Sequence, residues 1–210
     1  MKLYMFPVAP NPTRVRLYVA EKREAGAKFD LEEVLVSLIE KEQQSEEHRA
    51  RNPLAKLPVL ETEDGQFLTD SVAIIEYLEE LIPEPAMIGT TAIERARTRE
   101  LDRIIDVGIL LPIARTVHAT DSPLGLPPNP AVAKHERASL PPNLAIVEAR
   151  LSDGRPFLMG ERPTITDCTL AAALQFGRMK SATIPESYEA IARWDTAFRE
   201  RASAKQVLVL

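Results

Sequence analysis

The sequence is poor in cysteine and glycine, and it contains no long hydrophobic run. Its 210 residues include one cysteine, Cys168, which excludes an internal disulfide and any Cys-x-x-Cys pair. So few thiols are typical of a reducing compartment, and we expect a cytoplasmic location. No apolar run reaches the roughly 18 residues of a membrane-spanning helix. The first residues, MKLYMFPVAP, lack the apolar segment of a secretory signal.

The sequence also lacks the charge excess and the residue clusters of several functional classes. Lys and Arg number 26 against 31 Asp and Glu, a net charge of −5, whereas nucleic-acid binders usually carry a basic excess. There is no His/Cys/Asp cluster at metal-ligand spacing, and there is no GxxxxGK or GxGxxG phosphate loop. We therefore expect no metal, no nucleic-acid partner and no membrane partner.

The first 82 residues alternate strand and helix patterns. Strands are expected at 2–6, 29–36, 57–61 and 66–69, and helices at 11–25, 41–51 and 70–82. The order is βαβ, a further helix, then ββα. The first unit predicts a parallel strand pair with a right-handed crossover, to which the hairpin adds an antiparallel edge.

The pattern changes after residue 82. Residues 83–91 contain two prolines and a glycine, and we interpret them as a linker. From 92 to 210 the sequence predicts helices only. One predicted apolar stripe consists of Leu101, Ile104, Ile105, Gly108 and Leu111. A second stripe begins beside Pro141-Pro142. Because proline inside a helix costs about 3 kcal/mol or more, we expect that helix to begin, kink or break there.

Residues 164–167, Thr-Ile-Thr-Asp, form a variant of the capping box. Thr164 is expected to cap the N–H of Asp167, whose carboxylate reaches back to the N–H of Thr164. We interpret this motif as a folding element that begins a buried helix. Cys168 follows it within an apolar run and is expected in the core.

The segment 52–71, NPLAKLPVLETEDGQFLTDS, contains the most informative pattern of the chain. Pro58 directly precedes a strand, a position that suits a residue with no N–H for the sheet. Asp70 and Ser71 begin a helix, and both are favoured N-cap residues. The free N–H groups of a helix start attract carboxylates. Together these features predict a site for a small extended peptide, bound by its main chain and its anionic end.

These motifs resemble the cytosolic glutathione transferase family, in its bacterial type. The family pattern NPxxKxPVLExxDGxxLTDSxAIxxYL is met between Asn52 and Leu78, and FLMGERPTITDCTLAAAL resembles its helix-capping segment. Trp194 lies where the last main helix of the family often carries tryptophan. The resemblance covers nearly the whole chain. It implies a thioredoxin-like α/β domain at 1–82, with a cis-proline before the third strand, and an all-α domain at 92–210.

The resemblance also implies how glutathione is bound. Leu57, which precedes the cis-proline Pro58, would pair with the cysteinyl main chain. Asp70 would accept from the γ-glutamyl ammonium, and Ser71 would donate to its α-carboxylate. The candidates for the glycine carboxylate are Lys56 and either Gln43 or Gln44. Lys56 is equally consistent with a solvated surface charge.

The residue that activates the thiol is where the sequence departs from the family. A free thiol has a pKa near 8.5, and lowering it by about two units needs roughly 2.7 kcal/mol of anion stabilisation. The family usually supplies Tyr, Ser or Cys after the first strand, but Ala9 stands at the common Ser position. Since there is no cysteine here, the thiol-transfer branches of the family are not expected.

Asn11 is the main remaining candidate for this role. Some bacterial relatives carry Thr-Pro-Asn here, and their Asn donates to the sulfur. The alternative for Asn11 is a helix N-cap before Pro12. Tyr4, in the first strand, is the second candidate. Main-chain amides at the helix start, or no group at all, are the other possibilities.

Four further polar residues are interpreted from their position in the sequence. Thr13 and Arg14 lie in the first helical turn and could assist, but each alone is expected at the surface. His48 is expected at the surface of a polar helix. His118, with Ile113 and Val117, is a candidate for the wall of the second-substrate cleft.

The sequence therefore predicts a glutathione transferase that presents an activated thiolate to a small hydrophobic electrophile or a peroxide. The family usually forms homodimers, and we expect one here. Two alternatives stay open. One is a non-catalytic homologue that binds glutathione or another ligand, which Ala9 favours. The other is an interaction protein built on the same fold.

Overall fold

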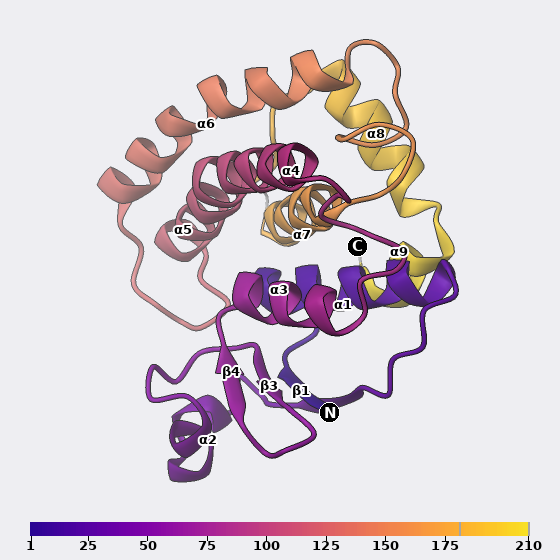
Figure 1. Ribbon diagram of the computed structural model, residues 1–210. Coiled ribbons are helices and arrows are strands. Elements are labelled where there is room, and N and C mark those ends of the chain that lie inside the picture. Colours follow the sequence, from indigo (N-terminus) through magenta and orange to yellow (C-terminus); the bar gives the residue numbers. More distant parts are fainter. Residues whose placement is uncertain (181, 210) are drawn as a thin grey trace.

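The computed structural model describes residues 1–180 and 182–209, in which a small sheet lies beside a larger group of helices (Figure 1). The strands are β1 (Lys2–Met5), β2 (Glu32–Leu35), β3 (Val59–Glu61) and β4 (Phe67–Thr69). Their order is β2-β1-β3-β4. Strands β1 and β2 are parallel, and β3 runs antiparallel to both β1 and β4. The predicted thioredoxin-like arrangement is confirmed.

The helices of this part are α1 (Pro10–Glu24), η1 (Glu42–Gln44), α2 (Glu46–Arg51) and α3 (Ser71–Leu81). The expected helix at 41–51 is thus split, because the Ser45 side chain accepts from the N–H of His48 and begins a new helix. The expected strand at 29–36 is shorter than predicted. The Arg23 guanidinium donates hydrogen bonds to the carbonyl oxygens of Phe29 and Leu31, and β1 has no residues opposite these two.

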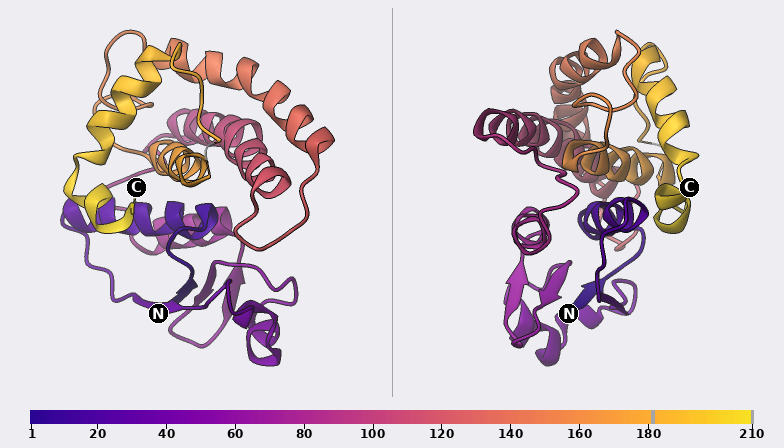
Figure 2. Two further views of the ribbon diagram at one scale, coloured as in Figure 1. Left: turned by 180° about the vertical axis from the view of Figure 1, so that it is seen from behind. Right: turned by 45° about the vertical axis from the view of Figure 1, so that its right-hand side comes forward.

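The helices of the second part are α4 (Ala92–Ile105), α5 (Leu111–Thr120), α6 (Pro130–Leu151), α7 (Ile165–Met179), α8 (Glu189–Arg199) and α9 (Ala202–Val207). Helix α7 is central, and its residues 165–177 are all buried. Helix α1 lies between the sheet and these helices, and it packs against α7 and α9 (Figures 1 and 2). Among residues 1–180 and 182–209, no helix has the length and apolarity to cross a membrane.

Helix α4 does not continue directly into α5, because the π-helical segment Asp106–Leu110 (η2) lies between them. Pro112 has no N–H for the carbonyl of Gly108, and in a regular α-helix its ring would clash with that carbonyl. A wider turn avoids the clash, with the Leu111 N–H donating to the carbonyl of Asp106, five residues back. The predicted apolar stripe is therefore wrong at Leu111, which is 36% exposed.

Helix α6 is continuous through Pro141 and Pro142. The expectation that a helix begins or breaks at these residues is wrong, since α6 begins at Pro130 behind the N-cap Asn129. Both prolines lie on the exposed side of the helix. Water can therefore hydrate the carbonyls that lose a helical partner.

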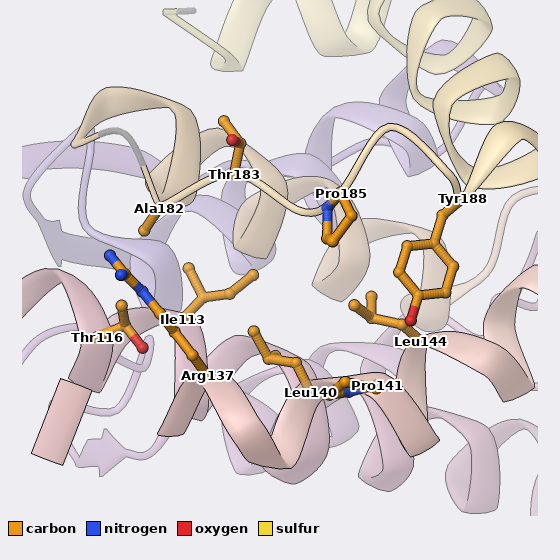
Figure 3. A pocket seen from close by; sticks show the side chains of 10 residues that line it. All are labelled: Ile113, Thr116, Arg137, Leu140, Pro141, Leu144, Ala182, Thr183, Pro185 and Tyr188. Atoms are coloured by element: carbon orange, nitrogen blue, oxygen red, sulfur yellow. The ribbon is translucent and has the colours of Figure 1, made fainter. Parts of the chain in front are cut away.

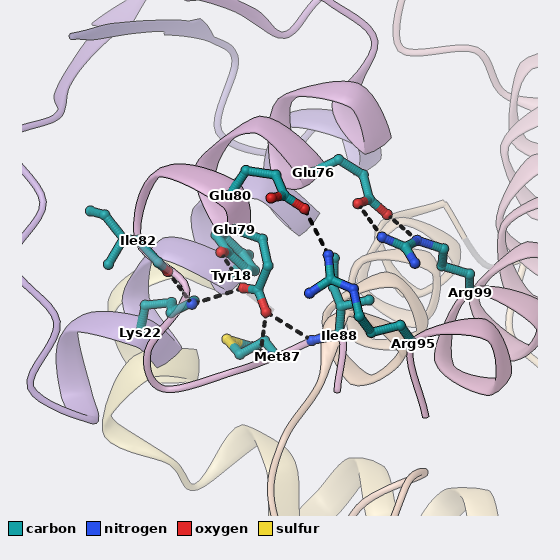
Figure 4. A network of polar contacts seen from close by, with 10 residues as sticks. All are labelled: Tyr18, Lys22, Glu76, Glu79, Glu80, Ile82, Met87, Ile88, Arg95 and Arg99. Carbon is teal, nitrogen blue, oxygen red and sulfur yellow. Dashed lines mark hydrogen bonds and ion pairs between the residues drawn. The ribbon is translucent and has the colours of Figure 1, made fainter. Parts of the chain in front are cut away.

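A buried ion pair ties the sheet-bearing part to the segment that leads into α4 (Figure 4). Lys22 of α1 and Glu79 of α3 are 0% and 1% exposed, and their charged atoms lie 2.8 Å apart. The Glu79 carboxylate also accepts from the Tyr18 hydroxyl and from the N–H groups of Met87 and Ile88. A buried charge pair is tolerated when its remaining polar atoms are bonded in this way. Nearby, two pairs join α3 to α4, Glu76–Arg99 and Glu80–Arg95 (Figure 4).

The capping box at the start of α7 is confirmed. One carboxylate oxygen of Asp167 accepts from the N–H of Thr164 at 2.8 Å, and the other accepts from the N–H of Leu158 at 2.9 Å. Burial raises the pKa of Asp167 to about 6. The neighbouring Cys168 is 0% exposed, and burial raises the pKa of its thiol, so it is an inert core residue as predicted.

Replacing Asp167 by alanine tests this box. The change leaves the N–H groups of Thr164 and Leu158 buried without an acceptor, at about 1–3 kcal/mol each. We expect Asp167→Ala to lower the free energy of unfolding by about 3 kcal/mol in urea titrations at pH 8, where the carboxylate is ionised. Asp153→Ala, which removes an exposed carboxylate paired with Arg155, is the control and should cost under about 0.5 kcal/mol. Equal losses for the two variants would contradict the role of the box.

Candidate functional site

The site is built around the peptide bond between Leu57 and Pro58, which is cis as predicted. Leu57 lies just before β3, and its side chain packs in a small apolar cluster with Tyr4, Val36 and Val59. Over the described residues, the main-chain N–H and C=O of Leu57 have no hydrogen-bond partner. They are therefore available to the main chain of an extended ligand.

His48 and Asn52 hold the residue that precedes Leu57. The His48 Nε2 and the Asn52 Nδ2 lie 3.1 Å and 2.9 Å from the carbonyl oxygen of Lys56. Because a carbonyl only accepts, Nε2 of His48 carries the proton and donates. The expected surface position of His48 is wrong, since the residue is 1% exposed. Its contact partner lies eight residues away, in a loop whose path the sequence pattern did not reveal.

Asp70 is the N-cap of α3, and one of its carboxylate oxygens accepts from the N–H groups of Val72 and Ala73 at 2.9 and 3.2 Å. Among the described residues its other carboxylate oxygen has no partner. The Ser71 hydroxyl is directed into the protein, where it accepts from Nε of Arg14 at 2.8 Å and donates to the Asn11 side chain at 3.4 Å. The hydroxyl therefore already has an acceptor within the protein, and the expectation that Ser71 donates to a ligand stays a prediction.

Arg14 is the centre of this buried polar chain. Its guanidinium is 3% exposed and contacts the Asp106 carboxylate in η2 at 3.0 Å, so the expected surface position is wrong. Asp106 also binds Arg103 at 2.7 Å. A series of polar contacts thus runs from Asp106 through Arg14 and Ser71 to Asn11, and it connects the helical part of the protein to the start of α1.

Asn11 is the second residue of α1, so the alternative that it caps this helix is wrong. The N-cap position belongs to Ala9, which offers no side-chain cap. The carbonyl oxygen of the Asn11 amide accepts from Ser71, so the NH2 group of this amide stands at the end of the series of polar contacts described above. This NH2 group has no acceptor in the part of the chain that the structure describes.

The hydroxyl groups of Thr13 and Tyr4 both donate hydrogen bonds within the protein. Thr13 is 0% exposed, which corrects the expected surface position, and its hydroxyl bonds the carbonyls of Pro7 and Ala9. The Tyr4 hydroxyl donates to Glu61 on β3 at 2.6 Å. Burial and this hydrogen bond raise the pKa of Tyr4 above its ordinary value.

The candidates for the glycine carboxylate differ in exposure. Gln43 is 7% exposed, and its side-chain oxygen is buried with no partner among the described residues. Gln44 and Lys56 are exposed. Lys56 forms no ion pair within residues 1–180 and 182–209, so its ammonium is available to an anion.

An apolar cavity of about 230 Å³ lies beside the start of α1. Ala9 and Pro10 line it together with residues of α5, α7 and three loops, among them Leu38, His118, Phe176 and Met179. Of the three residues expected at the cleft wall, only His118 lines this cavity. Ile113 and Val117 are instead 1% and 0% exposed in the core.

His118 is the polar group of this cavity. Its Nδ1 lies 3.0 Å from the Ser122 hydroxyl, and its ring lies 5.9 Å from that of Phe176. Burial lowers the pKa of His118, so the ring is neutral at pH 7. Phe176 and Met179 were not predicted at this site, because an apolar residue near the end of a buried helix carries no sign of a cavity in the sequence.

Comparisons with known proteins identify relatives over most of the chain. Residues 3–86 match the family model "Glutathione S-transferase, N-terminal domain", and residues 129–194 match "Glutathione S-transferase, C-terminal domain". The chain is 31% identical over 189 residues to glutathione S-transferase GstA of Escherichia coli O157:H7, covering 89% of this chain and 88% of that protein. It is 27% identical over 212 residues to glutathione S-transferase 2 of Saccharomyces cerevisiae, covering 99% and 89%.

A solved structure extends this similarity to the arrangement of the elements. The crystal structure of a glutathione S-transferase from Methylobacillus flagellatus with glutathione bound superposes with a TM-score of 0.83. The two sequences are 26% identical, and the match covers 100% of this chain and 99% of that one.

Replacing Arg14 tests the buried chain. Arg14→Ala leaves the Ser71 hydroxyl without its donor and leaves Asp106 with Arg103 alone. We expect a loss of about 3 kcal/mol in the free energy of unfolding, measured in urea, because one partner of a buried pair is removed. Arg97→Ala, which removes an exposed guanidinium paired with Glu100, is the control and should cost under about 0.5 kcal/mol. A loss at Arg14 no larger than at the control would refute the chain as a structural link.

Proposed function

The chain belongs to the glutathione S-transferase family, and on that premise we propose that it is a bacterial-type glutathione transferase that acts on small hydrophobic electrophiles or peroxides. One observation carries the proposal. Asn11, whose side-chain NH2 group has no acceptor among the described residues, stands at the start of α1, and the apolar cavity lined by Ala9 and Pro10 lies at the same helix end. A donor for a thiolate and a site for an apolar co-substrate are thereby adjacent.

We propose that glutathione lies in an extended form across the ends of β3 and α3. The N–H and C=O of Leu57 pair with its cysteinyl main chain. Its γ-glutamyl group meets the free carboxylate oxygen of Asp70 and the N–H of Ser71 at the α3 start. Lys56 and Gln43 are the proposed partners of its glycine carboxylate, with Gln44 as the exposed alternative to Gln43.

The Asn11 amide is the proposed donor to the thiolate. An N–H donor and the positive end of a 15-residue helix both favour the anion. The Ser71 hydroxyl, which Arg14 holds in place, donates to the oxygen of the Asn11 amide and so leaves the NH2 group of that amide for the thiolate. Tyr4 is the less favoured candidate, since its hydroxyl already donates to Glu61.

The cavity beside α1 is the proposed site of the electrophile. Bound there, the electrophile is held next to the sulfur, and this proximity removes much of the entropic cost of a bimolecular step. The thiolate donates its electron pair to the electrophilic carbon, forming a C–S bond while the leaving group departs with its bonding pair. Apolar walls favour an aromatic or alkyl substrate.

Simple measurements distinguish the proposed enzyme from two other functions. Ala9 at the usual Ser position favours a homologue that binds glutathione, or another ligand, without catalysis. An interaction protein on this fold is the third possibility. Retention on glutathione-agarose with turnover supports the enzyme, and retention without turnover across varied electrophiles supports the binding protein. Absence of retention supports the interaction protein.

Assembly, location and domain limits are also proposals. Exposed apolar side chains on α4, η2 and α5, at Ile93, Val107 and Leu111, support the expected homodimer, which sedimentation can test. We further propose domains at 1–82 and 92–210, joined by the linker 83–91. The cytoplasmic location proposed here rests on the low cysteine content alone.

Asn11→Ala tests the activation of the thiol. Loss of the amide donor should raise the pKa of enzyme-bound glutathione by about one unit, which corresponds to one hydrogen bond to the anion. The measurement is the ultraviolet absorbance of the thiolate against pH. Tyr4→Phe is the control and should leave the pKa unchanged. If Tyr4→Phe raises the pKa and Asn11→Ala does not, the assignment is wrong.

Asp70→Asn tests the γ-glutamyl site. Asparagine keeps the N-cap acceptor but lacks the charge that a substrate ammonium needs. Titration calorimetry should show glutathione affinity reduced by roughly ten- to a hundredfold, the value of a charge-assisted hydrogen bond, with thermal stability near that of the parent. Asp64→Asn, in the exposed β3–β4 turn, should leave affinity unchanged. Unaltered affinity in Asp70→Asn would overturn the site.

A further inference from the structure

The opening of the cavity beside α1 carries two large aliphatic side chains that face water. Ile39 and Leu124 both line this cavity, yet they are 73% and 39% exposed. Ile39 lies in the loop between β2 and η1, and Leu124 lies in the loop between α5 and α6, which extends from the helices toward the sheet (Figure 1). We call these two residues the apolar rim, to which each part of the chain contributes one side chain.

The loop between β2 and η1 holds Ile39 in a closed turn. The Ser37 N–H donates to the Glu42 carboxylate at 2.6 Å, and the Glu42 N–H donates to the Ser37 carbonyl at 2.9 Å. The Ser37 hydroxyl also accepts from the N–H of Glu40 at 3.1 Å. Because these bonds close the loop on both sides of Ile39, the exposure of this side chain is a fixed feature of the fold.

The loop between α5 and α6 holds Leu124 in the same manner. The Ser122 hydroxyl accepts from the N–H of Leu124 at 3.2 Å, and the Ser122 carbonyl accepts from the N–H of Gly125 at 3.0 Å. The Asn129 N–H donates to the carbonyl of Ala119 at 2.8 Å and so ties the end of the loop to α5. Two aliphatic side chains on closed turns thus extend the apolar surface of the cavity outward, where a ligand can cover them.

The lining of the cavity does not offer a partner for a charged ligand group. None of the described lining residues is Asp, Glu, Lys or Arg. His118 is neutral at pH 7, because burial lowers its pKa. An ionised group that enters such a cavity loses its hydration and gains no opposite charge, which is costly. The cavity and the apolar rim therefore favour an uncharged chain.

The size of the cavity sets the length at which a chain reaches the apolar rim. Its volume of about 230 Å³ accommodates about eight non-hydrogen atoms, at roughly 30 Å³ for each water-sized group. The carbons of a longer chain leave the cavity at its opening. There Ile39 and Leu124 cover one side of the chain while water covers the other.

We propose that the cavity and the apolar rim together select electrophiles with an uncharged, unbranched alkyl chain of more than about eight carbons, and that Ile39 and Leu124 set this chain-length preference. The first carbons fill the cavity, and the remaining carbons lie across the apolar rim. This inference rests on the function proposed above, because it starts the chain at the sulfur of glutathione.

S-alkylglutathiones test the preference without the need for turnover, since their chain is already joined to the sulfur. Titration calorimetry on the full chain compares the S-hexyl, S-octyl, S-decyl and S-dodecyl compounds. We expect S-dodecylglutathione to bind on the order of tenfold more tightly than S-octylglutathione, at about twofold for each CH2 that is covered on one side. S-(11-carboxyundecyl)glutathione, which ends in a carboxylate, should bind no more tightly than S-octylglutathione.

Substitutions in the apolar rim identify the residues responsible. Ile39→Ser and Leu124→Ser should each reduce the dodecyl-to-octyl affinity ratio to about threefold, and the double variant should abolish the preference. Leu126→Ser is the matched control, because Leu126 lies in the same loop, is 51% exposed and does not line the cavity. It should keep the ratio of the parent.

The outcomes separate this inference from the proposed function. The inference alone is overturned if S-octyl- and S-dodecylglutathione bind equally, if the rim variants keep the ratio of the parent, or if the carboxylate compound binds as tightly as S-dodecylglutathione. If neither glutathione nor any S-alkylglutathione binds, the proposed function is contradicted, and the chain-length preference is contradicted with it.

Discussion

The buried guanidinium of Arg14 is the contact on which the rest of the structure depends. It binds Asp106 from the helical part, and it donates to Ser71 at the start of α3. Because a charge that is 3% exposed needs partners on several sides, α1, α3 and η2 cannot move independently without leaving it unpaired. The same contact orders the Ser71 hydroxyl and, through it, the Asn11 amide. The same residue therefore contributes both to the joining of the two parts and to the order of the candidate site.

The position of Asp106 follows in turn from Pro112. A proline six residues later forces the π-helical turn, and that turn sets the direction from which the Asp106 carboxylate leaves the helix. The close approach of α6 to this turn requires glycine at position 108, because a Cβ there would lie 2.3 Å from the Asn143 side chain. A local feature of one helix thus fixes contacts on two sides, toward α1 and toward α6.

The parts of the structure that the sequence predicted are those whose chemistry lies within a few residues. The N-cap at Asp70 and the capping box at Thr164 and Asp167 are short patterns of this kind, whereas the cis-proline at Pro58 was implied by the resemblance to the family. The errors concern partners far away in the chain. Arg14 looks like a surface residue until Ser71, 57 residues later, supplies its acceptor. The direction of the amide of Asn11, the proposed thiol activator, cannot be deduced from the sequence for the same reason, because its contact with Ser71 joins residues 60 positions apart.

Helix α5 forms a wall of two cavities, and its register decides which side chains line each of them. His118 lines the cavity beside α1, while Ile113 and Thr116 line a second cavity, between α5 and α6 (Figure 3). One residue corresponds to about 100° of rotation in an α-helix. The π-helical turn accommodates one extra residue. Without it, the side chains of α5 would be rotated by about 100° around the helix axis. His118 and Thr116 would then leave their cavities. The register that supplies Arg14 with Asp106 therefore also places one polar side chain of α5 in each cavity.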